Sequence, residues 1–205
     1  MTIPASLVRY LALGDSYTIG TGGPPDRSFP AQLAVRWRAR GITVELRNLG
    51  VNGFTTDDLI REELPVVPRV RPTLTSLLIG ANDVVAGRDA ETYRIRLRLI
   101  LTRLRTDGVT ADRLLVVSSP DWSRAPASAR FGDAASVARL VDEYARVARA
   151  EAERVGARYF DIVPLARAQA ERGMFAPDRL HFSAAAYVEW AGALDAAMAR
   201  WGLPS

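Results

Sequence analysis

The chain lacks several side chains on which whole classes of chemistry depend. Its 205 residues include no cysteine, one histidine and no lysine, so arginine supplies all 27 basic side chains. Without cysteine, the chain cannot form a disulfide, a thiolate metal site or a thiol nucleophile. Without lysine, it has neither the amine of Schiff-base chemistry nor the lysine of a phosphate-binding P-loop. His181 is the only residue that can supply an imidazole.

Long hydrophobic runs are also absent. No stretch of about 18 apolar residues occurs, which argues against a membrane-spanning helix. Residues 1–6 carry neither a basic flank nor a long apolar segment of the kind found in secretory signals. We therefore expect a cytoplasmic protein with no membrane span.

The charge is mildly basic, with a formal net charge of +4 and a pI near 9.9. Arginine alternates with glutamate along the predicted helices, as at Arg149, Glu151, Glu153 and Arg154, which is typical of a solvated helix face. We therefore expect no nucleic-acid partner. The alternative, a nucleic-acid-associated protein, predicts steeply salt-dependent binding to generic DNA.

Predicted strands alternate with predicted helices along the chain, which predicts a doubly wound α/β domain over residues 1–205. The predicted strands are residues 7–13, 42–46, 74–79, 114–117 and 157–162. The predicted helices are residues 31–40, 57–64, 91–105, 134–155 and 184–201. This alternation predicts a parallel sheet with helices on both faces. The expected strand order is second, first, third, fourth, fifth.

Two finer expectations concern the predicted helices. We expect Pro65 and Pro68 to break the chain after the second helix, because proline disrupts a helix interior. In the third helix, Ile95, Leu99 and Leu101 form an apolar stripe that we expect to face the core.

Small polar clusters end the first four predicted strands: Gly14-Asp15-Ser16, residues 48–53, residues 80–83 and Ser118-Ser119. Connections that leave parallel strands emerge at one edge of the sheet, where ligands bind in open α/β folds. We therefore expect these clusters to share one crevice. His181, with Asp178 three residues before it, follows the last strand and should lie at the same edge.

These residues supply the parts that acyl transfer requires. Ser16 is the candidate nucleophile, His181 the base and Asp178 the acid that orients the base. The candidate oxyanion donors are the Ser16 N–H, the Gly53 N–H and the Asn82 side-chain amide. Each residue alone has a simpler interpretation, as a turn former or a buried histidine, but their combination favours catalysis.

The four motifs resemble those of the SGNH hydrolases, also called the GDSL esterase/lipase family. The matching segments are Gly14-Asp15-Ser16, residues 48–53 with the oxyanion glycine at Gly53, Gly80-Ala81-Asn82-Asp83, and Asp178-Arg179-Leu180-His181. Tyr17 stands where the eponymous motif usually has leucine. The resemblance implies a single-domain, flavodoxin-like three-layer α/β/α sandwich with a five-stranded parallel sheet. It also implies hydrolysis of esters, thioesters or related acyl groups without a metal or cofactor.

The substrate is expected to be a small ester, because no large apolar insertion or lid is evident. Acetylated sugars, short acyl esters, thioesters and lysophospholipids all remain open, as does the oligomeric state. Trp122 follows the fourth strand and is predicted to line the substrate pocket, although packing against the sheet end would equally explain it. The alternative function is a non-catalytic ligand-binding module on the same fold.

Overall fold

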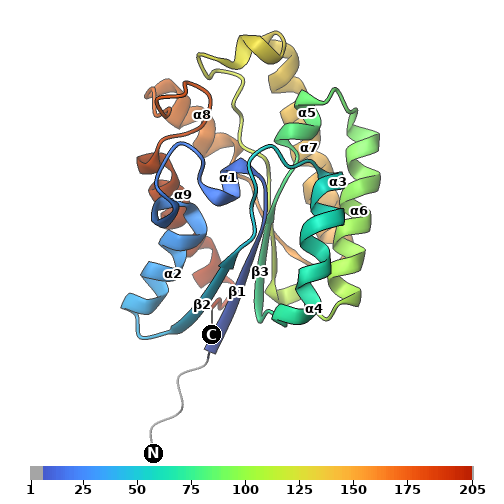
Figure 1. The fold of residues 1–205 in the computed structure, drawn as a ribbon, viewed down its shortest axis with the longest axis vertical. Coiled ribbons are helices and arrows are strands. Elements are labelled where there is room, and N and C mark those ends of the chain that lie inside the picture. The colour runs from blue at the N-terminus through green and yellow to red at the C-terminus, as the bar shows by residue number, and fades with distance from the viewer. Residues whose placement is uncertain (1–6, 205) are drawn as a thin grey trace, which may run out of the picture.

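The computed structural model describes residues 7–204 and contains a five-stranded parallel sheet between two layers of helices (Figure 1). The strand order is β2-β1-β3-β4-β5, which confirms the predicted topology. The strands are β1 (Leu7–Gly14), β2 (Thr43–Asn48), β3 (Leu74–Leu78), β4 (Leu114–Val117) and β5 (Arg158–Phe160).

The helices form the two outer layers of the sandwich. They are α1 (Ser16–Ile19), α2 (Phe29–Ala39), α3 (Thr56–Asp58), α4 (Val67–Val70), α5 (Ala81–Val85), α6 (Ala90–Thr106), α7 (Ala134–Arg154), α8 (Val163–Glu171) and α9 (Ala184–Arg200). In Figure 1, α2, α8 and α9 lie on one side of the sheet, and α6 and α7 lie on the other. This arrangement confirms the predicted single-domain α/β/α fold.

The core follows from the apolar strands at the centre of the sheet. All residues of β3 and β4 are buried, because helices cover both faces of a parallel sheet. The large aromatic side chains of Trp37, Trp190 and Phe29 fill the space between the sheet and the α2–α9 layer. No helix in residues 7–204 is long and apolar enough to cross a membrane.

The segment after β2 differs from the sequence-based prediction, because Pro65 and Pro68 do not end it. It stays helical from α3 to α4 through a π-helical stretch, Leu59–Glu63, and a 3₁₀ turn, Leu64–Val66. Each proline lies in the first turn of a new short helical piece. At that position its missing N–H leaves no intrahelical bond unmade.

Helix α6 also corrects one expectation. Ile95 and Leu99 are 53% and 48% exposed, so they do not face the core, whereas Leu101 is buried. The buried face of α6 is formed by Tyr93, Leu97, Ile100, Leu101 and Leu104. These positions recur every three or four residues, as one face of a helix requires.

The carboxyl ends of the strands lie at one edge of the sheet, at the top of Figure 1, where α1 and α5 follow β1 and β3. Both short helices begin within three residues of a strand, and neither is among the helices predicted from the sequence. The chain between β4 and α7 lies over this same edge. The predicted polar clusters are carried by these connections.

Candidate active site

Ser16 is held on a sharp turn between β1 and α1. Gly14 has φ +147°, and a Cβ atom there would lie 1.9 Å from the Leu78 carbonyl oxygen, so only glycine fits. Asp15 caps α1, and its Oδ1 accepts a hydrogen bond from the Tyr17 N–H at 3.0 Å. Ser16 is therefore the first residue of a helix that starts directly beyond the strand, and it is 4% exposed.

His181 and Asp178 lie together in the connection between α8 and α9. His181 Nδ1 is 2.7 Å from Asp178 Oδ2, while Asp178 Oδ1 accepts the N–H groups of Leu180 and His181 at 2.9 and 3.0 Å. Burial raises the pKa of Asp178, but these hydrogen bonds outweigh it and hold the pKa below its ordinary value. The ionised carboxylate therefore orients the ring and leaves Nε2 available to another partner.

Tyr17 packs against the imidazole. Its ring centroid lies 5.5 Å from that of His181 and 6.1 Å from that of Trp190. Tyr17 is buried. The departure from leucine at this position therefore gives His181 an aromatic neighbour.

One cleft brings most of the predicted site residues together. Ser16, Asn82, Trp122 and His181 all line it. The rest of the wall is mainly apolar and consists of Tyr17, Ala81, Val85, Phe131 and Leu180. In the described part of the chain no hydrogen bond joins the Ser16 hydroxyl to His181; such bonds are often long in ligand-free enzymes and shorten when substrate binds.

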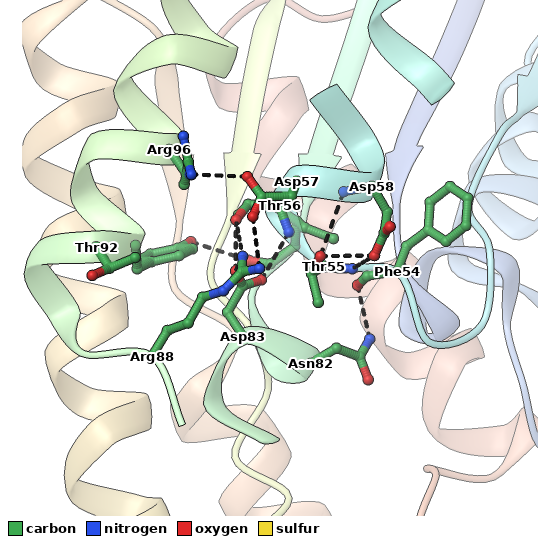
Figure 2. A network of polar contacts seen from close by, with 12 residues as sticks. Phe54, Thr55, Thr56, Asp57, Asp58, Asn82, Asp83, Arg88, Thr92 and Arg96 are labelled. Atoms are coloured by element: carbon green, nitrogen blue, oxygen red, sulfur yellow. Dashed lines mark hydrogen bonds and ion pairs between the residues drawn. The ribbon is translucent and has the colours of Figure 1, made fainter. Parts of the chain in front are cut away.

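The candidate oxyanion donors come from two further segments. Asn82 lies in the first turn of α5, and its Nδ2 donates a hydrogen bond to the Phe54 carbonyl at 2.9 Å (Figure 2). A side-chain amide has two N–H groups, so one stays available for a ligand. Gly53 lies beside Phe54 with φ +87° and is exposed, but it is not among the residues that line the cleft.

Two buried acids lie at the β1–α1 turn, Asp15 within the turn and Glu63 in contact with it. Glu63 Oε2 accepts the Gly14 N–H at 2.9 Å. Burial raises the pKa of Glu63 to about 9, with a further rise from the charge of Asp15, and burial raises the pKa of Asp15 to about 7. Sequence reasoning missed Glu63, because nothing in the sequence distinguishes it from its exposed neighbour Glu62.

Within residues 7–204, no group of three or more His, Cys, Asp or Glu side chains is placed to hold a metal ion.

Sequence reasoning also missed Val85 and Phe131 in the cleft wall. Val85 ends the short helix α5 and Phe131 ends a 3₁₀ turn, and elements this short have no periodic pattern from which the direction of a side chain could be predicted.

The cleft lies at the edge of the sheet where the strands end, which is where ligands bind in open α/β folds. The model of the GDSL-like lipase/acylhydrolase family matches residues 12–188. The chain therefore belongs to the GDSL-like lipase/acylhydrolase family, whose members are also called SGNH hydrolases. Ester hydrolysis in general follows from this membership.

Solved structures share the fold over nearly the whole chain. LAE5, an alpha/beta hydrolase enzyme from the metagenome of Lake Arreo, Spain, is 23% identical with a TM-score of 0.75, covering 97% of this chain and 96% of its own. EstA, a psychrotrophic esterase from Pseudoalteromonas sp., is 15% identical with a TM-score of 0.74, covering 94% and 97%. A variant of Axe2, an acetyl xylan esterase from Geobacillus stearothermophilus, is 20% identical with a TM-score of 0.73, covering 91% and 92%. A comparison with curated proteins gave no match.

Proposed function

We propose that the protein is a serine esterase that hydrolyses small carboxylic esters through an acyl-enzyme. One observation carries this proposal. His181 Nδ1 is hydrogen-bonded to Oδ2 of the ionised Asp178 at 2.7 Å, and His181 lines the same cleft as Ser16. A hydroxyl, a base and an acid that orients the base are the parts that nucleophilic acyl transfer requires.

In the proposed reaction, His181 Nε2 takes the Ser16 hydroxyl proton while Ser16 Oγ attacks the ester carbonyl. The N–H groups of Ser16 and Gly53 and the amide of Asn82 stabilise the tetrahedral oxyanion. The imidazolium then gives its proton to the leaving alkoxide, and the acyl-enzyme forms. Water, deprotonated by His181, releases the acid and restores the Ser16 hydroxyl.

The cleft wall supports a small, uncharged acyl or alcohol group as the part of the substrate that enters. Trp122 is 2% exposed, and Phe131 packs against it edge-on at 5.8 Å between ring centroids. Ligand pockets with mainly apolar walls favour apolar groups. An acetyl or similarly short acyl group suits a cleft whose wall is filled by these two aromatic rings, and acetyl esters are also the substrates named for Axe2.

The nucleophile is tested with p-nitrophenyl acetate. We expect Ser16→Ala to lower kcat by at least about 10³, because the remaining oxyanion donors still give some rate. Ser119→Ala is a matched control, because Ser119 is also a buried serine beyond a strand and does not line the cleft. Equal activity in the Ser16 variant and the control, at unchanged melting temperature, would refute the assignment.

A further inference from the structure

Two of the proposed oxyanion donors depend on segments that are remote along the chain. Gly53 belongs to the connection after β2, whereas Asn82 belongs to α5, which follows β3. Oxyanion donors lower the barrier only when they are held in place before the charge develops. The contacts that fix the Gly53 segment against α5 therefore bear directly on the rate.

Two adjacent sets of hydrogen bonds join these segments. The first is the hydrogen bond from Asn82 Nδ2 to the Phe54 carbonyl at 2.9 Å. The second is made by Asp83, whose carboxylate accepts the Thr56 N–H at 2.9 Å and the Thr56 hydroxyl at 2.6 Å. Asp83 has no exposed surface, so the hydrogen bonds between Asp83 and Thr56 involve a buried charge that needs a compensating partner.

Arg88 supplies that partner (Figure 2). Its Nη1 donates to Asp83 Oδ1 at 2.5 Å and to Thr56 Oγ1 at 3.1 Å, and its Nη2 donates to Asp57 Oδ2 at 2.7 Å. Its backbone is fixed as well, because Arg88 N–H donates to the Asp83 carbonyl and its carbonyl accepts the Tyr144 hydroxyl. Only a guanidinium reaches several acceptors in one plane.

Burial also makes Asp83 sensitive to Arg88. Burial raises the pKa of Asp83, while the hydrogen bonds from Thr56 and the charge of Arg88 oppose that rise. Arg96, the other arginine in this region, bonds Asp57 at 2.9 Å and makes no bond to Asp83. In the described residues, Arg88 is thus the only cation paired with the buried Asp83 carboxylate.

We propose that Arg88 is a positioning residue for the oxyanion hole, acting through Asp83 and Thr56 to hold the Gly53 N–H in register with the Asn82 amide. The inference rests on the proposed esterase function. Arg88 does not line the cleft, so it acts on the donors and not on the substrate.

The kinetic test uses Arg88→Met, which keeps the length of the side chain and removes its charge and donors. We expect kcat for p-nitrophenyl acetate to fall about tenfold to a hundredfold with KM nearly unchanged, because small misplacements of catalytic groups are costly. Arg88→Lys should recover part of the loss. Arg61→Met is the matched control, because Arg61 pairs with Asp58 and Glu62 of its own segment and not with Asp83.

A double-mutant cycle separates positioning from general stability. In an Asp83→Asn background the carboxylate through which Arg88 acts is already gone, so Arg88→Met should lower kcat by less than about threefold. A loss as large as in the wild-type background would mean that Arg88 acts on the rate independently of Asp83, and the inference would be overturned.

Hydrogen exchange tests the same inference without a substrate. We expect backbone amides of residues 50–57 to exchange faster in Arg88→Met, with α2 and α9 unchanged. Unaltered exchange over residues 50–57 would overturn the inference even if the enzyme is active. Conversely, a wild-type protein without Ser16-dependent esterase activity would refute the proposed function, and the exchange result would still decide whether Arg88 holds the segment.

Discussion

Carboxyl groups around Ser16 differ in charge because their surroundings differ. Asp178 is half exposed and receives three hydrogen bonds, which keep its pKa low and the group ionised. Glu63 is 2% exposed and receives one hydrogen bond, from Gly14, so burial dominates and its pKa rises. The proposed acid that orients His181 is thus charged at neutral pH, whereas Glu63, which supports the β1–α1 turn, is protonated.

The raised pKa of Glu63 makes the free energy of unfolding depend on pH. The pKa of Glu63 is about 9 in the folded chain against 4.5 ordinarily. Between these values the folded state keeps a proton that the unfolded state has lost, so stability falls as pH rises. The pKa of Asp15, about 7, adds the same trend below neutrality, and the interval from about pH 7 to 9 therefore isolates Glu63.

We expect Glu63→Gln to flatten the decline of melting temperature over that interval. Glutamine can still accept the Gly14 N–H and cannot ionise, so the variant should melt about 3 °C or more above wild type at the alkaline end. Glu62→Gln is the control, because Glu62 is exposed next to it. The same slope in all three proteins, measured by thermal unfolding, would contradict the account.

At the scale of elements, the β1–α1 junction depends on close backbone approach. A side chain at Gly14 would meet the Leu78 carbonyl and the Thr18 hydroxyl at 1.9 and 2.4 Å. The Thr18 hydroxyl itself bonds the Leu13 and Leu78 carbonyls and so joins β1 to β3. The turn that carries Ser16 is therefore fixed by backbone contacts that leave no room for a Cβ.

Two alanine substitutions separate steric clash from backbone strain. Gly41 has φ +82° and open space around its Cβ position, so Gly41→Ala should cost about 1–2 kcal/mol. Gly14→Ala adds the clash, and we expect it to cost about 4 kcal/mol or more. Denaturant unfolding of both variants measures the difference, and equal losses would show that the junction tolerates a side chain.

The sequence predicted the elements whose signal is local. The apolar runs at residues 74–79 and 114–117 predicted two of the strands, and the alternation of strands with helices predicted a parallel sheet. The short helices α1 and α5 were missed because a single turn has no periodicity. On α6, Ile95 and Leu99 have the same apolar character as the core residues, and the packing of α6 against α7, α3 and the Leu64–Val66 turn decides which face is covered.

At the scale of the whole molecule, the parallel topology brings Ser16, Asn82 and His181 to one cleft although they come from three remote segments. The resemblance to a known family named these residues in advance, whereas Val85, Phe131 and Arg88 depend on how the connections pack. Trp122 is part of this cleft wall as well, which supports its proposed contact with substrate.

The wall residues should set the preferred acyl length. Phe131 is 40% exposed, so Phe131→Ala should cost little stability while enlarging the cleft, and Trp122→Ala should enlarge it further. We expect the ratio of kcat/KM for p-nitrophenyl butyrate to that for the acetate to rise about tenfold in either variant. Leu99→Ala, an exposed apolar site on α6 outside the cleft, is the control. An unchanged ratio in both wall variants would remove them from the substrate site.

Covalent labelling with a fluorophosphonate, read by intact-mass and peptide mass spectrometry, tests the central claim most directly. A lone imidazole that activates one hydroxyl predicts a single adduct on Ser16, strongly slowed in His181→Asn and lost in Ser16→Ala. An unlabelled wild-type protein, or an adduct on another residue, would contradict the account.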